Sequence, residues 1–183
     1  MFDEVTQKLL LPATVGVLPT DTLYGLVCRA SDQAAVRRLY TLKSREHKPG
    51  TIIAASLEQF ETLGLSRRYL TAVTQFWPGP ISVVVPSSPA LNYLDQGTGT
   101  LAVRIPDHNQ LRAVLEVTGP LLTSSANLPG QPSSTTIADA RGYFGTSVDF
   151  YIDGGPKEGL GSTIIRVVDD HIEILRQGDG QVQ

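Results

Sequence analysis

Short apolar runs bounded by proline or glycine recur along much of the chain, and segments with helical periodicity separate them. Brief apolar runs of this kind are typical of buried β-strands, which need only a few residues to cross a small core. Strands that alternate with helices favour a sheet with helices packed against it. The runs that we predict as strands are Val15–Leu18, Thr51–Ala55, Ile81–Val85, Leu101–Ile105 and Leu121–Thr123.

The clearest helical pattern spans Gln33–Ser44, where buried-type side chains recur three and four residues apart. Asp32 precedes it, and an aspartate at this position accepts hydrogen bonds from the free N–H groups of the first helical turn. The positions that share the inner face of this helix are Val36, Leu39, Tyr40 and Lys43. Further helices are predicted at Leu57–Leu63, Arg67–Phe76 and Gln110–Val117, with a short one from Thr135 or Thr136.

The C-terminal part of the chain has a different pattern. Thr163–Val168 and Ile172–Leu175 flank three polar residues, Asp169, Asp170 and His171, which predicts a β-hairpin. Because a hairpin pairs its strands antiparallel, we expect an α/β chain with some α+β character. Its core would be an open, twisted, mixed parallel and antiparallel sheet flanked by helices. With 41% hydrophobic residues, residues 1–183 are expected to form a single domain.

Composition argues against several classes of protein. The net charge of -3 gives no overall basic surface, so nucleic-acid binding would need a local patch. No stretch approaches the ~18 consecutive apolar residues of a membrane span, and the N-terminus lacks a signal-peptide pattern. Cys28, the only cysteine, lies in an apolar stretch and is interpreted as a small buried hydrophobic residue. We therefore expect a cytoplasmic protein without membrane contact.

Common metal-binding and phosphate-binding motifs are missing from the sequence. His47, His108 and His171 lie far apart among polar neighbours, so they are interpreted as surface residues and not as metal ligands. The glycine-rich stretch Gly154–Gly161 resembles a phosphate loop, but Lys157 precedes the final glycine, unlike in a Walker A sequence. We predict an exposed loop there, which is the segment most suited to close over a site.

Three polar segments offer groups for an anionic ligand. Lys43-Ser44-Arg45, with Lys48 nearby, follows the clearest helix, and Thr123–Asn127 and Pro19–Gly25 each follow a predicted strand. Small hydroxyl and amide groups at strand ends suit phosphate oxygens, and open sheets usually bind ligands there. Each segment alone also fits a plainer interpretation, such as helix-end cations or a hydroxyl-rich turn. Their order along the chain is more informative than any one of them.

Taken in order, these segments resemble the motifs of the YrdC/TsaC family, the threonylcarbamoyl-AMP synthases, in its short single-domain form. The similarity runs from Pro19–Gly25 to Leu175–Gly178 and so covers nearly the whole chain. Between those ends lie the K-x-R pair Lys43 and Arg45, Trp77–Pro80, Ala102–Pro106, the S-x-N pair Ser125 and Asn127, and Ser162–Ile165.

The resemblance implies a reaction and a set of site residues. The family joins L-threonine, bicarbonate and ATP to give threonylcarbamoyl-adenylate and pyrophosphate, a nucleotidyltransferase reaction that supplies tRNA threonylcarbamoyladenosine modification. ATP would be a substrate, with Mg2+ held through its phosphates and no metal ligand from the chain. The residues expected to take part in catalysis are Lys43 and Arg45. The residues expected to contact ATP are Lys43, Arg45, Lys48, Thr100, Ser125, Asn127, Ser133 and Arg176. The residues expected to contact threonine are Thr22, Tyr24, Arg104, Thr123 and Ser162.

Two alternatives stay open at this point. One is a non-catalytic YrdC-like module that holds tRNA or double-stranded RNA on a basic surface. The other is a related carbamoyl adenylation, as in the YrdC-like domain of hydrogenase-maturation carbamoyltransferases, whose long chains carry zinc-binding cysteines. The intact K-x-R and S-x-N pairs favour the synthase, whose expected partners are the proteins that transfer the threonylcarbamoyl group to tRNA. The basic surface would draw on Arg37, Arg38, Lys43, Arg45, Lys48, Arg67 and Arg68.

Overall fold

The structure, a computed structural model, describes residues 2–44, 48–169 and 171–182. Its strands are β1 (Gly16–Pro19), β2 (Tyr24–Arg29), β3 (Thr51–Ile53), β4 (Ile81–Pro86), β5 (Thr100–Arg104), β6 (Leu121–Ser125), β7 (Phe150–Tyr151), β8 (Thr163–Val168) and β9 (His171–Arg176). Its α-helices are α1 (Phe2–Leu10), α2 (Gln33–Leu42), α3 (Leu57–Leu63), α4 (Arg67–Thr71), α5 (Asn92–Asp95), α6 (Asn109–Thr118) and α7 (Ile137–Phe144). Two short 3-10 helices are η1 (Thr74–Phe76) and η2 (Pro89–Leu91).

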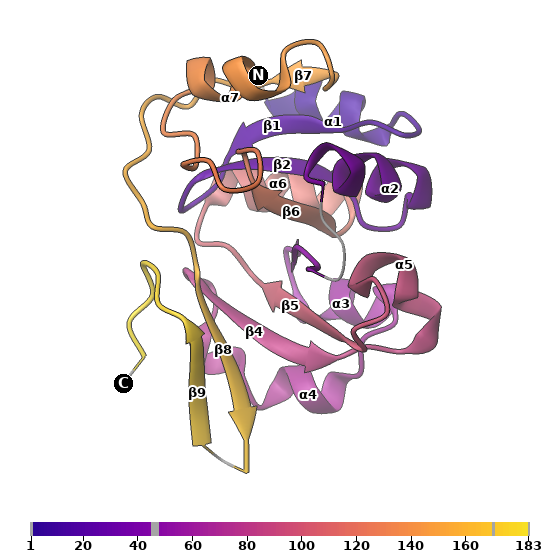
Figure 1. The fold of residues 1–183 in the computed structure, drawn as a ribbon. Helices are drawn as coiled ribbons and strands as arrows, with labels where there is room; N and C mark the ends of the chain where they lie inside the picture. The colour runs from indigo at the N-terminus through magenta and orange to yellow at the C-terminus, as the bar shows by residue number, and fades with distance from the viewer. Residues whose placement is uncertain (1, 45–47, 170, 183) are drawn as a thin grey trace.

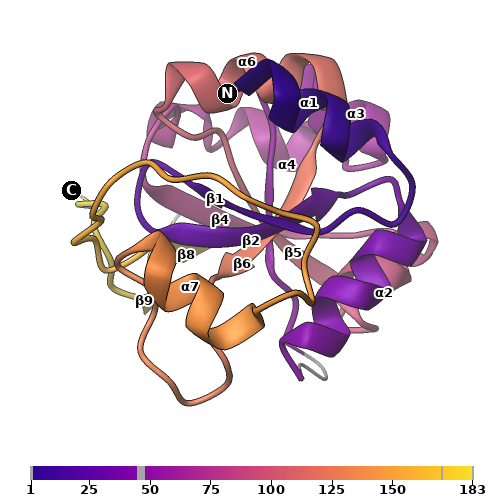
Figure 2. The same ribbon diagram turned by 90° about the horizontal axis from the view of Figure 1, so that it is seen from above.

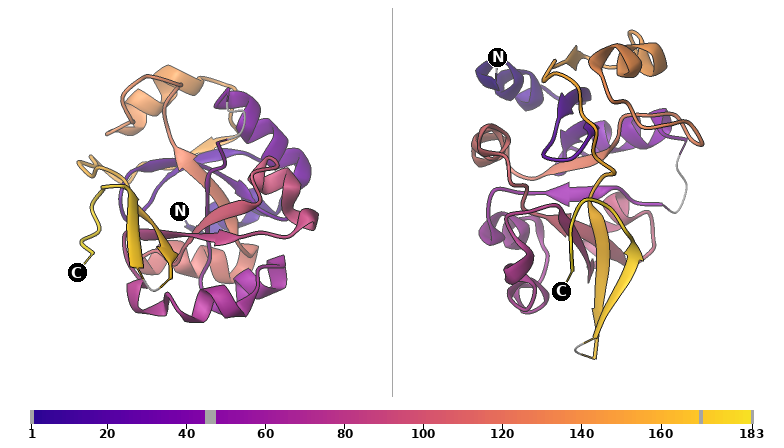
Figure 3. Two further views of the ribbon diagram at one scale, coloured as in Figure 1. Left: turned by 60° about the horizontal axis from the view of Figure 1, so that its bottom comes forward. Right: turned by 90° about the vertical axis from the view of Figure 1, so that its left-hand side faces the viewer.

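Within the described residues, all nine strands belong to one sheet, in the order β7-β1-β2-β6-β3-β5-β4-β8-β9. β6 pairs antiparallel with both β2 and β3, while β3 pairs parallel with β5 and β4 pairs parallel with β8. The predicted mixed, twisted sheet is therefore confirmed. Figure 1 shows the helices around the sheet and the β8–β9 hairpin extending beyond them at one end, and the second panel of Figure 3 shows the same hairpin from the side.

The two faces of the sheet carry separate apolar cores. The alternation of side chains in β6 sends Leu122 to the larger core, which includes buried residues of α2, α3, α4 and α7. Leu121 points to the opposite face and joins a smaller core with α1 and α6. Figure 2 shows α1 and α6 together on one side of the strands, with α2 and α7 on the other. Each face therefore has its own helical cover.

The second face changes character along β6, from apolar to polar. Thr123 and Ser125 lie on the same face as Leu121 because alternate residues of a strand share a face. Thr123 is paired with Thr51 of β3, and Ser125 with Gly25 of β2. Across β3, the same face continues to Ala102 and Arg104 of β5. Small and polar side chains thus replace the second core at this end of the sheet.

Most predicted elements are confirmed. α3 has the predicted bounds, and β8 and β9 form the predicted hairpin. Asp32 caps α2, because its Oδ1 accepts the N–H groups of Ala34 and Ala35 at 3.0 Å each. Cys28 is fully buried, and burial raises the pKa of its thiol far above the usual range, so it is inert as interpreted. No helix in the described part of the chain is long and apolar enough to cross a membrane.

One predicted helix was wrong in extent, and some elements were not predicted. The segment 67–76 is divided, since α4 ends at Thr71 and η1 begins at Thr74. The β-branched residues Thr71, Val73 and Thr74 lower the helix propensity at this break. α1 was not predicted, although Val5 and Leu9 are buried one turn apart on its inner face. The short elements α5 and β7 have too few residues to produce a periodic signal.

Candidate functional site

A cavity of about 300 Å³ lies over the polar half of the second face. Two glycines make room for it: a Cβ on Gly25 would lie 2.6 Å from Thr123 Oγ1, and one on Gly50 would lie 2.5 Å from the carbonyl oxygen of Thr123. Glycine at both positions therefore lets the neighbouring segments approach Thr123 closely. The sequence-predicted site residues that line this cavity are Thr22, Tyr24, Lys48, Arg104, Thr123, Ser125, Ser133, Ser162 and Arg176.

The turn between β1 and β2 brings two threonines to the cavity wall. Thr20 Oγ1 donates to the carbonyl oxygen of Leu23 at 2.7 Å and accepts the N–H groups of Thr22 and Leu23 at 3.2 Å each. Thr22 Oγ1 lies 3.2 Å from Thr20 Oγ1. Thr20 thus uses its hydroxyl to hold the turn, in the manner of a hydroxyl-capped turn. The β1–β2 turn therefore fixes the position of Thr22, which lines the cavity.

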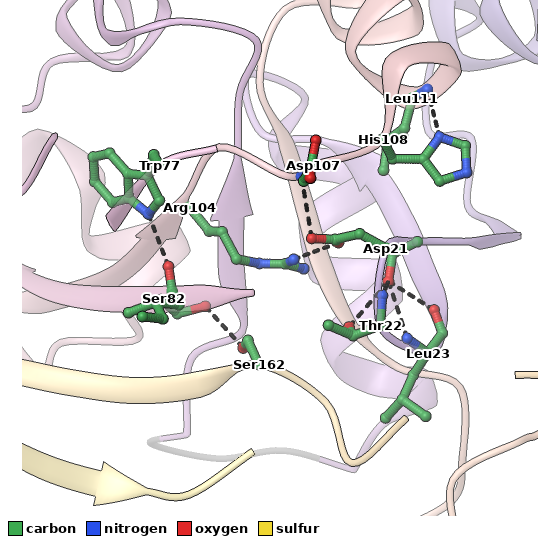
Figure 4. Close-up of polar contacts among 12 residues, drawn as sticks. Asp21, Thr22, Leu23, Trp77, Ser82, Arg104, Asp107, His108, Leu111 and Ser162 are labelled. Carbon is green, nitrogen blue, oxygen red and sulfur yellow. Dashed lines mark hydrogen bonds and ion pairs between the residues drawn. The ribbon is translucent and has the colours of Figure 1, made fainter. Parts of the chain in front are cut away.

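A buried ion pair joins this turn to β5. Arg104 Nη1 donates to Asp21 Oδ1, and only 4% of the arginine side chain and 6% of the aspartate side chain are exposed (Figure 4). Asp21 Oδ2 accepts the N–H of Asp107 at 3.2 Å, which ties the turn to the chain that leaves β5. A charge that is buried this deeply needs a partner of opposite sign. Arg104 therefore lines the cavity as one half of a pair.

Ser162, at the entrance to β8, is held from two sides. Ser82 of β4 is fully buried, and its Oγ donates to Ser162 Oγ at 2.9 Å (Figure 4). Arg176 Nη2, from β9, donates to the carbonyl oxygen of Ser162 at 2.7 Å. These bonds bring the N-terminal end of β8 and the C-terminal end of β9 to the same wall of the cavity. Two predicted residues from separate motifs, Ser162 and Arg176, are thereby neighbours.

A second cavity, of about 760 Å³, adjoins the first, and Lys48 lines both. Lys43 and Asn127 line the second cavity. The Lys43 ammonium donates to the carbonyl oxygens of Ser125 and Asn127 at 2.7 and 2.5 Å, and to Asn127 Oδ1 at 3.0 Å. Ser125 Oγ donates to the same Oδ1 at 2.6 Å. The K-x-R lysine and the S-x-N pair, 82 and 84 residues apart, therefore form one cluster.

The segment 152–162 runs along the open side of the sheet from β7 to β8, on the left in Figure 1. Tyr24 anchors it: the phenol oxygen donates to the carbonyl oxygen of Gly155 at 2.8 Å and accepts the Gly154 N–H at 2.9 Å. Burial raises the pKa of this phenol, so it stays protonated as the donor. Leu160 and Gly161, at the other end of the segment, line the first cavity. Tyr24 is thus a fully buried residue that both lines the cavity and tethers its neighbouring loop.

Two predicted residues are not part of this grouping. Thr100 lies at the opposite end of β5 from Arg104 and lines neither cavity. Arg45 lies outside the described residues, as does His47. The predicted roles of Arg45 and Thr100 toward ATP therefore stay predictions.

Sequence reasoning missed the groups that support the predicted residues. Asp21, Thr20 and Ser82 were given no role, although the first two belong to a motif that was singled out. A signal for Asp21 was available in the sequence. An arginine inside an apolar strand, such as Arg104 in Leu101–Ile105, requires a buried acid as its partner. Asp21 is an acid in the hydroxyl-rich segment that follows the first predicted strand. Ser82 carries no such signal, because a serine in a buried strand is common and its partner is 80 residues away.

The other charged side chains bear on two further kinds of site, a metal centre and an RNA-binding surface. Among residues 2–44, 48–169 and 171–182, no group of three or more His, Cys, Asp or Glu side chains is placed to hold a metal ion. Of the cations considered for an RNA surface, Arg38 pairs with Asp149 at 2.5 Å and Arg67 pairs with Glu61 at 3.1 Å. Lys43 is only 2% exposed. These contacts reduce the positive charge that the predicted surface would offer to RNA.

Residues 8–178 match the model of the Sua5/YciO/YrdC family, which carries the description telomere recombination. The chain belongs to the Sua5/YciO/YrdC family. A threonylcarbamoyl-AMP synthase of Chromohalobacter salexigens is 38% identical over 141 residues, which cover 74% of this chain and 76% of the relative. A threonylcarbamoyl-AMP synthase of Bacillus subtilis is 33% identical over 171 residues, which cover 90% of this chain and 49% of the relative.

A solved member of the Sua5/YciO/YrdC family has the same fold. The crystal structure of Pyrococcus abyssi Sua5 complexed with L-threonine matches with a TM-score of 0.84 and 31% sequence identity. The match covers 97% of this chain and 54% of that one, so the chain spans about half of the Pyrococcus protein. The family membership expected from the ordered motifs is confirmed.

Proposed function

We propose that this chain is a threonylcarbamoyl-AMP synthase, a nucleotidyltransferase that converts L-threonine, bicarbonate and ATP into threonylcarbamoyl-adenylate, pyrophosphate and water. Two family members described above carry that name, and a third was solved with L-threonine. The observation that carries the proposal is the convergence of four segments on one cavity that adjoins a second, cationic one. The converging side chains are Thr22, Arg104, Thr123 and Ser162.

The chemistry of the first cavity suits an amino acid. A guanidinium matches a carboxylate in shape and charge, so Arg104 would hold the threonine carboxylate. Hydroxyls act as both donors and acceptors, so Thr22, Thr123 and Ser162 would serve the amino and hydroxyl groups of the substrate. The volume of about 300 Å³ is at the small end of ligand pockets and fits one amino acid. Tyr24 would form part of the wall.

The second cavity would hold the nucleotide. Lys48 lies where the two cavities meet, and Lys43, Ser125 and Asn127 form the adjoining cluster. ATP contacts by Arg45, Thr100, Ser133 and Arg176 belong to the proposal as the family resemblance implies them. Mg2+ would be held by phosphate oxygens and water, because the described cavity walls offer hydroxyls, amides and cations in place of a carboxylate cluster. The ion would supply charge that offsets the triphosphate.

The reaction needs positioning more than it needs a protein nucleophile. The amino group of threonine and bicarbonate form a carbamate with loss of water, and a carbamate oxygen then attacks the α-phosphorus of ATP while pyrophosphate leaves. Two anions must be brought together, so the cations of the K-x-R motif, Lys43 and Arg45, would stabilise the charge of the transferring group.

The test is pyrophosphate release by the purified chain with ATP, Mg2+ and bicarbonate, comparing L-threonine, L-serine and no amino acid, with the adenylate identified by mass spectrometry. We expect release that requires both threonine and bicarbonate. Release that is independent of either, or a folded protein that binds L-threonine and ATP but forms no adenylate, would overturn the proposal. A folded protein that binds labelled tRNA without any turnover would instead support the RNA-binding module.

The reaction implies a cellular setting. Its product is a labile mixed anhydride, so proteins that transfer the threonylcarbamoyl group to tRNA would have to accept it soon after release. Since the reaction consumes ATP and serves tRNA, we place the enzyme in the cytoplasm. Fractionation of cells that express the tagged chain, followed by the same pyrophosphate assay on each fraction, would test this placement.

A further inference from the structure

Asp21 uses both carboxylate oxygens inside the protein. Oδ1 accepts from Arg104 Nη1, and Oδ2 accepts the backbone N–H of Asp107. The second bond fixes the carboxylate to the chain that follows β5 (Figure 4). The Asp21 carboxylate therefore cannot rotate away from Arg104 without breaking its hydrogen bond to the Asp107 N–H. Asp21 thus holds Arg104 through an anchor on the very segment that carries Arg104.

Arg104 has few other constraints. It is 3% exposed, and no acceptor among the described residues reaches its buried Nε. Among the described residues, its side chain makes one hydrogen-bonded ion pair, with Asp21, and the residue also lines the first cavity. The part of the guanidinium that Asp21 does not hold is therefore directed at the ligand space. Without Asp21, a long side chain with several rotatable bonds would have no polar group in the described structure to orient it.

We propose that Asp21 is a positioning residue for the substrate carboxylate: it acts through Arg104, by setting the plane and direction of the guanidinium that binds an α-carboxylate in the first cavity. The inference rests on the proposed function, which makes the ligand of this cavity L-threonine. Asp21 need not touch the substrate itself. Its contribution is the geometry of the Arg104–carboxylate pair, on which a bidentate contact depends strongly.

Charge alone predicts the opposite effect. Asp21 is an anion close to a site for another anion, so its field opposes substrate binding and partly cancels the attraction of Arg104. If only charge mattered, removing Asp21 would tighten threonine binding. If orientation matters more, removing it weakens binding in spite of the gain in positive charge. The direction of the change therefore separates the two effects.

The experiment is a double-mutant cycle in the full chain, with Asp21→Ala, Arg104→Ala and the double variant. Each protein is assayed with L-threonine and with L-threoninol, which keeps the amine and hydroxyl but lacks the carboxylate. For Asp21→Ala we expect KM for threonine to rise by about 10- to 100-fold, the range for one misaligned charge-assisted hydrogen bond. KM for ATP should stay within about twofold, and the preference for threonine over threoninol should shrink.

The cycle also shows whether Asp21 acts through Arg104. The double variant should be no worse toward threonine than Arg104→Ala alone, because the effect of Asp21 disappears with its target. Additive losses, or a lower KM for threonine in Asp21→Ala, would overturn the proposal. A loss that is equal for threonine and threoninol would also overturn it, since that result would mean a general structural defect.

Two further variants guard against simple unfolding. Asp21→Asn keeps an oxygen for Arg104 Nη1 but loses the acceptor for the Asp107 N–H, so it should restore only part of the threonine preference that Asp21→Ala loses. If Asp21→Ala does not fold, this variant and calorimetric titration with L-threonine carry the test. Glu61→Ala removes a half-buried acid from the ion pair with the exposed Arg67, lies outside both cavities and should change no kinetic constant.

Failure of the proposed function would look different. In that case the unmodified chain would release no threonine-dependent pyrophosphate. The positioning proposal would then be decided by L-threonine binding alone, with the same five variants and threoninol as the control ligand.

Discussion

Lys43 is the C-cap residue of α2, one turn after the buried Leu39 and Tyr40, and its ammonium ends among three oxygens of the S-x-N turn. A lysine at the end of a helix is ordinarily a solvated cation near the helix dipole. Here 2% exposure shows that the charge is enclosed by acceptors. The residue thus holds the loop that carries Ser125 and Asn127, and any role toward phosphate would be exerted from within that cluster.

This placement gives Lys43→Ala two expected effects, one on stability and one on turnover. The variant removes the three hydrogen bonds that the ammonium donates to the S-x-N turn, so we expect the free energy of unfolding to fall by about 2–4 kcal/mol, in addition to a loss of turnover of about 100-fold or more. Chemical denaturation and the pyrophosphate assay measure the two effects. Lys43→Met is the matched variant, because it keeps most of the apolar stem and removes the charge. Full activity in either variant would remove Lys43 from the catalytic group.

At the residue scale, the motifs located most of the candidate site but not its supports. Thr22, Arg104, Thr123 and Ser162 come from four distant segments, and the structure brings them to one cavity. Asp21 and Ser82 were missed because their importance lies in a partner across the sheet, at sequence separations of 83 and 80. Local pattern does not encode such pairings. The roles of the site residues stay predictions until ligands are bound.

At the scale of elements, the predictions found most helices and strands but missed α1 and the break between α4 and η1. α3 has the predicted bounds, whereas α1 went unpredicted and the helix expected at Arg67–Phe76 is divided. The segment 152–162 is the element with most consequence for the site, because it connects the anchor at Tyr24 with Leu160 and Gly161 at the cavity. Its geometry depends on one phenol, which no periodic signal identifies.

Tyr24→Phe tests that anchor. The change removes both hydrogen bonds to Gly154 and Gly155 and leaves the ring in the core, so stability should fall by only about 1 kcal/mol. We expect faster amide hydrogen exchange across residues 154–161 and a higher KM for substrate, because the loop beside the cavity is less restrained. Tyr151→Phe is the control: its hydroxyl donates to the carbonyl oxygen of Gly145 at 2.7 Å, and Tyr151 lines neither cavity. Equal behaviour of both variants would contradict the anchoring role.

At the scale of the whole molecule, one sheet connects two cores. That the chain forms a single cooperative domain stays a prediction, and Gly16 offers a way to test it. A Cβ on Gly16 would lie 2.1 Å from the ring of Phe150, on β7 at one edge of the sheet. Trp77, the only tryptophan, packs against Phe60 of α3 at a ring distance of 5.9 Å, in the larger core. The mutation and the probe therefore report on different cores.

For Gly16→Ala, we expect overpacking to cost about 1–3 kcal/mol. In a single cooperative unit, the unfolding midpoint measured by Trp77 fluorescence and the midpoint measured by far-ultraviolet circular dichroism should fall together. Gly142→Ala, inside α7, where an added Cβ meets nothing within 4 Å, is the matched control and should raise both midpoints slightly, because alanine favours a helix more than glycine does. A fluorescence midpoint that does not move while the dichroism midpoint falls would divide the molecule into two units.

β6 has a consequence for the order of events during synthesis. The strands β1 and β2 pair with each other, and β3, β5 and β4 form a second group, but β6 alone pairs with a member of each group in the described sheet. While the ribosome is still short of residue 125, at roughly 5–20 residues per second, a nascent chain therefore holds two separate half-sheets with open inner edges for some seconds. The same strand supplies Thr123 at the floor of the first cavity. β6 thus joins the two half-sheets and adds the cavity floor in one step, and the later strands β8 and β9 complete the cavity wall with Ser162 and Arg176.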